Sequence, residues 1–218
     1  MKKKPDGRRI SLKVPLLYFL YLFIGWSIYR IGFKFSDSLE ELYIKPIIWL
    51  LPFLYLIPKE KLKIADLGIT VKNFFPSIYL SLALGVGFAF LGIIANMAKY
   101  GGIDFGANIG SGFFATALFI SFATSVTEEF VFRGYLLGRL MRKFDEWMSV
   151  ALATVLWTAI HVPIIFFVWG ISGMQIAVYL GLTFIYGLGA SVVFVRTKNL
   201  VAPTLLHVLW EWPVILFR

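Results

Sequence analysis

Residues 127–136 read Thr-Glu-Glu-Phe-Val-Phe-Arg-Gly-Tyr-Leu and place two carboxylates and an arginine inside an apolar run. This run, residues 113–140, is long enough to cross a bilayer as one helix. A charge at the centre of a membrane helix costs about 2.5–3.5 kcal/mol on insertion scales, so such residues usually face the protein interior and mark a functional site. The stretch therefore predicts a polar site buried within a membrane helix.

Two of these charges are spaced so that they can neutralise each other. On a helix, Glu129 and Arg133 lie one turn apart and can form an ion pair. Glu128 is rotated by about 100° from Glu129 and lies five residues from Arg133, so we expect it to be less compensated and available for chemistry. The alternative is a purely structural ion pair that fixes the helix register, but that role needs only one glutamate.

The composition indicates a polytopic membrane protein. Of the 218 residues, 59% are apolar and 18% are aromatic, whereas soluble domains are about 45–50% apolar. The chain has no cysteine, which excludes disulfides, thiol nucleophiles and thiolate metal sites. Lys and Arg outnumber Asp and Glu by 21 to 12, and in a membrane protein this excess indicates basic cytoplasmic loops rather than a nucleic-acid partner.

The hydropathy pattern predicts an all-α bundle of about seven transmembrane helices in a single integral membrane domain, residues 1–218. The basic start resembles a signal peptide, but the following apolar run is long enough to span, so we expect it to be retained. Pro46 and Pro52 interrupt the second span, and Gly85, Gly87 and Gly92 in the third permit close helix approach. The expected spans are residues 14–33, 43–57, 74–97, 113–140, 147–169, 174–195 and 200–217.

The basic residues predict the orientation of these spans. If the N-terminus is cytoplasmic, the outer segments hold five of them, Arg30, Lys34, Lys45, Lys99 and Arg218. The inner segments hold fifteen, and this bias places the N-terminus inside and the C-terminus on the opposite side of the plasma membrane. The fifteen are Lys2, Lys3, Lys4, Arg8, Arg9, Lys13, Lys59, Lys61, Lys63, Lys72, Arg139, Arg142, Lys143, Arg196 and Lys198.

The chain has only two histidines, His161 and His207, and both fall within predicted spans. A single His in an apolar helix is usually a packing residue, but two of them together with an intramembrane glutamate indicate a site. Measured from the cytoplasmic helix ends, Glu128, His161 and His207 lie at depths of about 16, 21 and 10 Å. They share a layer in the middle to inner part of the membrane, on spans four, five and seven. Glu211 lies one turn after His207 on the same face and can join them.

Three motifs follow one another in the second half of the chain: Glu-Glu-x-x-x-Arg at Glu128, Glu129 and Arg133, an aromatic-x-x-x-His at Trp157 and His161, and a final His-x-x-x at His207. Together they resemble the CPBP family of intramembrane proteases. This family includes the type II CAAX prenyl endopeptidases and relatives linked to bacteriocin self-immunity. The resemblance covers about residues 113–212, the expected catalytic core.

The resemblance implies a role for each motif residue. It assigns activation of the attacking water to Glu128 and His161, support of the oxyanion to His207 and Glu211, and structural support of the site to Glu129 and Arg133.

Two positions depart from the family pattern. Trp157 stands where Phe is common, which is a tolerable aromatic exchange, and Glu211 stands where Asn is usual. An Asn side chain donates a hydrogen bond to an oxyanion, whereas an ionised Glu only accepts. Either Glu211 is protonated in its apolar surroundings, or this protein uses the position differently.

The residues themselves agree with peptide hydrolysis. A buried Glu can act as a general base, and a neutral His can orient the same water or protonate the leaving amine. Without Cys or an evident Ser-His-Asp set, no covalent acyl-enzyme is expected. The use of a metal stays open: Glu128, His161 and His207 are candidate zinc ligands with an open water position. However, the His-Glu-x-x-His pattern is absent, and a metal-free mechanism would use the same residues.

We therefore expect an intramembrane endopeptidase that acts on a membrane-embedded peptide or a prenylated, CAAX-type protein, in contact with the lipid bilayer and with no nucleic acid. Two alternatives have other functions. One is a non-catalytic immunity or peptide-binding protein. The other is a proton-coupled transporter, which would be expected to show inverted repeats or paired broken helices, and the sequence shows neither.

Overall fold

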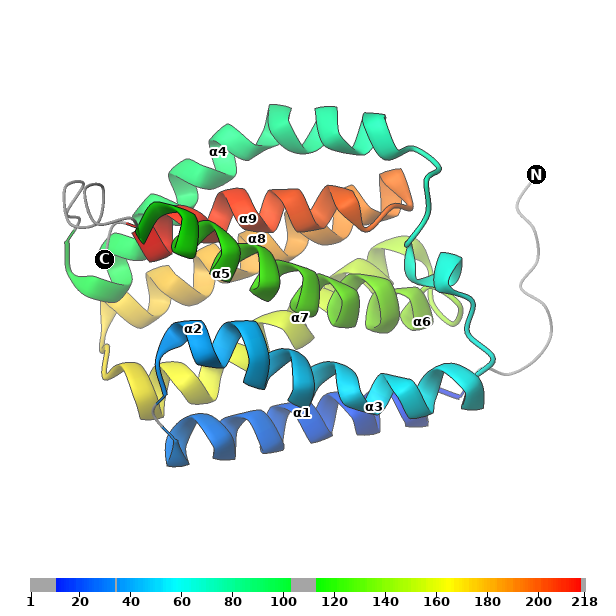
Figure 1. Ribbon diagram of the computed structural model, residues 1–218, viewed down its shortest axis with the longest axis horizontal. Coiled ribbons are helices and arrows are strands. Elements are labelled where there is room, and N and C mark those ends of the chain that lie inside the picture. The colour runs from blue at the N-terminus through cyan, green and yellow to red at the C-terminus, as the bar shows by residue number, and fades with distance from the viewer. Residues whose placement is uncertain (1–10, 34, 103–112, 217–218) are drawn as a thin grey trace.

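The computed structural model describes residues 11–33, 35–102 and 113–216, and within these ranges the chain forms helices and connections without strands. The long helices lie side by side along the longest axis of the molecule (Figure 1). The first helix begins at one end of this bundle, and the last helix ends at the other. The prediction of an all-α bundle is confirmed.

Six helical segments are long and apolar enough to cross a membrane. The seventh predicted span forms α9 (Val201–Leu216), which with 16 residues is shorter than the other six. The six are α1 (Lys13–Gly32), η1 with α3 (Glu40–Ile44 and Lys45–Lys59), α4 (Phe74–Tyr100), α5 with η3 and α6 (Phe113–Glu129, Phe130–Leu137 and Gly138–Leu140), α7 with η4 (Glu146–Ile164 and Ile165–Trp169) and α8 (Met174–Thr197).

The second span is longer than the sequence suggested, and it is continuous. It was expected at residues 43–57 with interruptions at two prolines, but it forms one continuous candidate span over Glu40–Lys59. Pro52 lies inside α3, where neighbouring helices can satisfy the freed backbone group. The short helix α2 (Asp37–Leu39) precedes this span, and the 3₁₀ turn η2 (Ile64–Leu67) follows it.

The helix that carries the two adjacent glutamates changes its winding directly after them. The π-helical segment η3 begins at Phe130, the residue after Glu129, and such wider turns occur frequently at functional sites. A Cβ atom on Gly134 in η3 would lie 2.9 Å from the carbonyl oxygen of Leu67. Only a glycine therefore allows η2 to approach η3 this closely, which fixes the site helix against the connection.

The last helix is held by a close contact with α4. A Cβ atom on Gly92 would lie 2.1 Å from the carbonyl oxygen of Trp210, and one on Gly85 would lie 2.1 Å from the side chain of Leu209. The predicted close approach is confirmed at these two glycines and is wrong at Gly87, which has no neighbouring atom within 4 Å. This contact fixes the position of the helix that carries the second histidine.

Candidate active site

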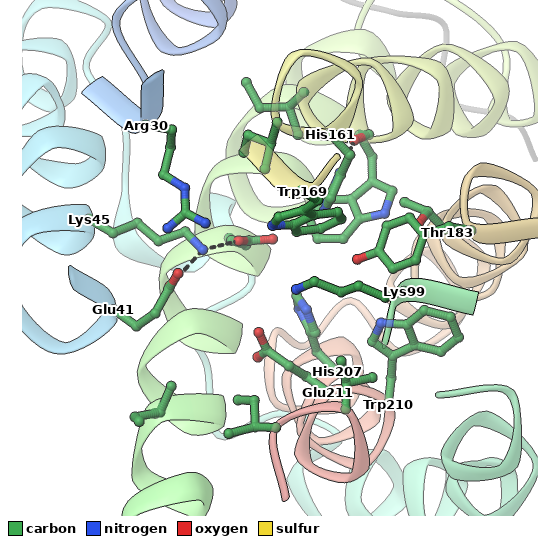
Figure 2. A pocket seen from close by; sticks show the side chains of 18 of the residues that line it. Arg30, Glu41, Lys45, Lys99, His161, Trp169, Thr183, His207, Trp210 and Glu211 are labelled. Carbon is green, nitrogen blue, oxygen red and sulfur yellow. Dashed lines mark hydrogen bonds and ion pairs between the residues drawn. The ribbon is translucent and has the colours of Figure 1, made fainter. Parts of the chain in front are cut away.

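A cavity of about 340 Å³ lies within the bundle, and side chains from all the predicted site helices line it (Figure 2). Four of the six predicted site residues line it, namely Glu128 on α5, His161 on α7, and His207 and Glu211 on α9. Aromatic side chains form much of the remaining wall. They are Trp26, Trp49, Tyr100, Trp157, Trp169, Tyr179 and Trp210.

The other two predicted residues, Glu129 and Arg133, form the expected ion pair just outside the cavity wall. Arg133 Nη1 donates to Glu129 Oε1 at 2.9 Å, and both side chains are fully buried. Arg133 also donates to the carbonyl oxygen of Gly187 at 3.1 Å, and its guanidinium lies 4.6 Å from the ring centre of Trp157. The pair therefore joins the site helix to α8 and to α7.

Glu129 contacts several buried polar side chains besides Arg133. Its Oε1 atom also accepts a hydrogen bond from the Tyr186 hydroxyl at 2.7 Å and lies 2.9 Å from His207 Nδ1. One carboxylate therefore connects α5, α8 and α9. No residue of α8 was predicted to belong to the site, and Tyr186 showed no sequence signal beyond its place in an apolar span.

The structure corrects the expectation that Glu128 is poorly compensated. Lys45 on α3 forms an ion pair with Glu128, and the ammonium group is buried. The same ammonium donates to Glu41 Oε2 at 2.8 Å, and Thr124 on α5 donates to that oxygen at 2.8 Å. The expectation was wrong because it considered only partners within the same helix, whereas the counter-charge comes from another span.

Two further cations were counted from the sequence as outer-loop charges but belong to the cavity. Arg30 near the end of α1 and Lys99 near the end of α4 line it together with Lys45 (Figure 2). Arg30 pairs with the buried Glu40. One sequence signal pointed this way: Glu41 and Lys45 are spaced by four residues at the start of an apolar span, as an ion pair on a helix would be.

The hydrogen-bond partners of the two histidines define their ring orientation. His161 Nδ1 lies 2.9 Å from the carbonyl oxygen of Trp157, and since a carbonyl only accepts, Nδ1 carries the proton. His207 Nδ1 faces the Glu129 carboxylate in the same way. In each neutral ring, Nε2 is then an acceptor, so His161 can take a proton at this atom.

Glu211 lies on the cavity wall one helical turn beyond His207, as expected from its spacing (Figure 2). Its side chain is half-buried, and Oε2 has no hydrogen-bond partner among the described residues. A buried carboxyl oxygen without a partner is costly unless the group is protonated or meets a ligand. This oxygen is therefore a candidate contact for a bound substrate.

The zinc alternative is not supported by this arrangement. Within the described ranges, no group of three or more His, Asp or Glu side chains could hold a metal ion. Among the three candidate ligands, Glu128 is paired with the Lys45 ammonium, and a second cation at the same carboxylate would be repelled by it. His207 already directs Nδ1 to Glu129. Glu128, His161 and His207 therefore share a cavity without forming a metal-ligand set.

Comparison with known proteins gives one match. Residues 110–213 match a family model described as Rce1-like, type II CAAX prenyl endopeptidase. The matched segment contains all six predicted site residues. No curated protein and no solved structure matches the chain.

A bundle of apolar helices with glutamates and histidines around an internal cavity defines an integral membrane protein of the class that includes intramembrane hydrolases. The family match makes this assignment specific. Residues 110–213 form an Rce1-like segment, which is similar to the CPBP family of intramembrane proteases, and the predicted resemblance is confirmed.

Proposed function

We propose that this protein is an intramembrane endopeptidase that hydrolyses a peptide bond in a membrane-associated peptide or a prenylated, CAAX-type protein. One observation carries the proposal: Glu128 and His161 come from different helices and line one internal cavity with largely aromatic walls. In such a setting a carboxylate and an imidazole act as strong acid–base groups because little water competes with them.

In the first step, Glu128 accepts a proton from a water molecule held between its carboxylate and His161 Nε2, and the resulting hydroxide adds to the substrate carbonyl carbon. The tetrahedral intermediate then collapses. The carbon–nitrogen bond breaks, and the proton taken up by Glu128 moves to the leaving nitrogen, either directly or through His161 Nε2. The products are a carboxylic acid and an amine, and no covalent enzyme intermediate forms.

His207 and Glu211 support the oxyanion of the tetrahedral intermediate. His207 Nε2 can donate only if the ring carries two protons, because Nδ1 already faces Glu129. The Glu129 carboxylate then provides the counter-charge for the imidazolium, and Arg133 and Tyr186 keep that carboxylate in place. Glu129 and Arg133 are positioning residues in this scheme, since neither lines the cavity.

Lys45 positions the general base and keeps it ionised. Its ammonium is shared between Glu128 and Glu41, so Glu41 can hold the cation when Glu128 takes up a proton. A carboxylate without a counter-charge at this depth would become protonated and could not accept a proton from water. The ion pair with Lys45 thus allows Glu128 to be an anion within the membrane.

Replacing Lys45 with Met should lower kcat by about 10- to 150-fold and leave KM unchanged, because the residue acts on Glu128 and a hydrogen bond to a charged group is worth about 1.5–3 kcal/mol. Lys45→Arg should restore part of the activity. The measurement is a steady-state assay with a membrane peptide, with Lys59→Met as the control because this exposed lysine lies on the same helix. A raised KM at unchanged kcat would instead place Lys45 among the substrate-binding residues.

Replacing Glu211 with Gln should preserve or raise activity, because an amide donates the hydrogen bond that a protonated carboxyl donates. Glu211→Leu, which has no donor, should lower kcat by about 10²- to 10³-fold. Both rates should be insensitive to a chelator. If Glu211→Gln were inactive and zinc restored activity in the wild-type protein after chelation, Glu211 would be a metal ligand rather than a donor.

A second function is favoured by one observation, the ion pair that occupies Glu128 in the structure. A non-catalytic peptide-binding or immunity protein would keep this pair closed and use the cavity only for binding. In that case Glu128→Gln would leave the biological effect of the protein intact.

The test is whether purified wild-type protein, reconstituted in lipid vesicles, shortens added membrane peptides while the Glu128→Gln variant does not. Products from the wild-type protein alone would support the endopeptidase. Peptide binding without products in either protein would support the non-catalytic alternative.

A further inference from the structure

The cavity extends from the middle of the bundle toward one end only. Its innermost wall is made by buried side chains in mid-helix, including Trp49, Glu128 and Trp157. From there it reaches residues at helix ends, since Tyr100 is the last residue of α4 and Trp169 the last residue of η4. Tyr100 is 43% exposed, so the cavity reaches the protein surface at this end.

This end of the bundle is the one where α1, α4 and α9 finish (Figure 1). The opposite end is separated from the cavity by packed protein. On α3, Trp49 at the innermost wall and Lys59 at the helix end are ten residues apart, which is about 15 Å of helix. Tyr135 and Arg139 lie toward that end and contact Glu60.

The exposed basic residues lie at the end of the bundle opposite to the end where the cavity reaches the surface, which we call the cavity mouth. They lie where α1, α4 and α7 begin and where α3, α6 and α8 finish. In the described ranges they are Lys13, Lys59, Lys61, Lys63, Lys72, Arg142, Lys143, Arg196 and Lys198.

Among the described residues, the basic ones at the end where the cavity opens are of a different kind. Arg30, Lys45 and Lys99 all line the cavity, and Arg30 and Lys45 are held in ion pairs with glutamates. They are wall residues and not loop charges, so they do not weaken the orientation signal. By the positive-inside rule, the basic end faces the cytoplasm.

We infer that the cavity opens on the extracytoplasmic face of the membrane and that the peptide substrate enters from that face. That a peptide substrate enters the cavity rests on the proposed protease function, whereas the direction of the opening follows from the cavity and from the positions of the basic residues. This direction also narrows the class of substrate. That class is an exported or membrane-anchored peptide that reaches the site in the middle of the membrane from the outer face, rather than a lipidated tail at the cytoplasmic surface.

The absence of native cysteine allows a direct test by labelling of single cysteines. Three full-length variants are expressed in bacteria, and the cells are converted to spheroplasts. The variants are Tyr100→Cys at the cavity rim, Ser172→Cys in the connection beside it, and Lys143→Cys at the opposite end. Each is treated with a membrane-impermeant maleimide before and after permeabilisation. Tyr100→Cys and Ser172→Cys should be labelled in intact spheroplasts, and Lys143→Cys only after permeabilisation.

Labelling of Lys143→Cys in intact spheroplasts would overturn the inference, because the basic end would then face outward. Labelling of Ser172→Cys without Tyr100→Cys would also overturn it, since the rim would not be open to that face. The labelling needs no catalysis and should be the same in a Glu128→Gln background. A failed protease assay with the expected labelling would therefore reject the proposed function and leave the direction of the cavity standing.

Discussion

Replacing Glu128 with Gln should lower kcat for cleavage of a membrane peptide by about 10²- to 10⁴-fold, which is the usual contribution of a general base. The amide has the same shape as the carboxylate but cannot accept the proton of the attacking water. Its oxygen can still accept a hydrogen bond from Lys45, so the protein should stay folded. His161→Ala should show a loss of the same order.

The control for this measurement is Arg196→Ala, which removes a cation that is 57% exposed and far from the cavity along α8. Its kcat should equal that of the wild-type protein. The assay is run with purified protein whose thermal transition is measured in the same detergent. Full activity of a folded Glu128→Gln enzyme would rule out Glu128 as the base.

Removing either partner of the buried Glu129–Arg133 ion pair should lower the stability of the folded protein more than the other substitutions do. Glu129→Ala leaves Arg133 as an uncompensated buried charge and also removes the acceptor for Tyr186 and His207. Arg133→Ala leaves Glu129 without its cation. Breaking a buried ion pair costs about 3–5 kcal/mol in soluble proteins, so both variants should show a strongly lowered unfolding midpoint and a reduced yield.

The matched control is again Arg196→Ala, because Arg196 and Glu146 form an exposed pair at 3.2 Å. Pairs of this kind contribute about 0–1 kcal/mol, so this variant should unfold close to the wild-type midpoint. Equal midpoints for Arg133→Ala and Arg196→Ala would show that the Glu129–Arg133 pair does not hold the site together.

The helical architecture and the ion pair within the site helix were predictable from the sequence. Spans follow from uninterrupted apolar runs, and a pairing of Glu129 with Arg133 follows from helical periodicity, since both signals are local. The match over residues 110–213 confirms the family resemblance that the motifs suggested. Assigning catalytic roles to these residues is still a proposal.

The counter-charge of Glu128 was not predictable in the same way. Lys45 and Glu128 are brought together only by the packing of α3 against α5, and nothing in their spacing specifies that contact. The same holds for Tyr186, whose hydroxyl reaches Glu129 from α8. Helix partners in a membrane bundle are chosen by shape and close packing, which a hydropathy pattern does not encode.

The central claim, that this site cleaves peptides with Glu128 as the base, is tested most directly by mass spectrometry of membrane peptides from cells that express wild-type protein or Glu128→Gln at equal levels. We expect a set of shortened peptides with the wild-type protein and their uncleaved precursors with the variant. Identical peptide profiles for the two proteins would show that Glu128 does not cleave peptides in the cell.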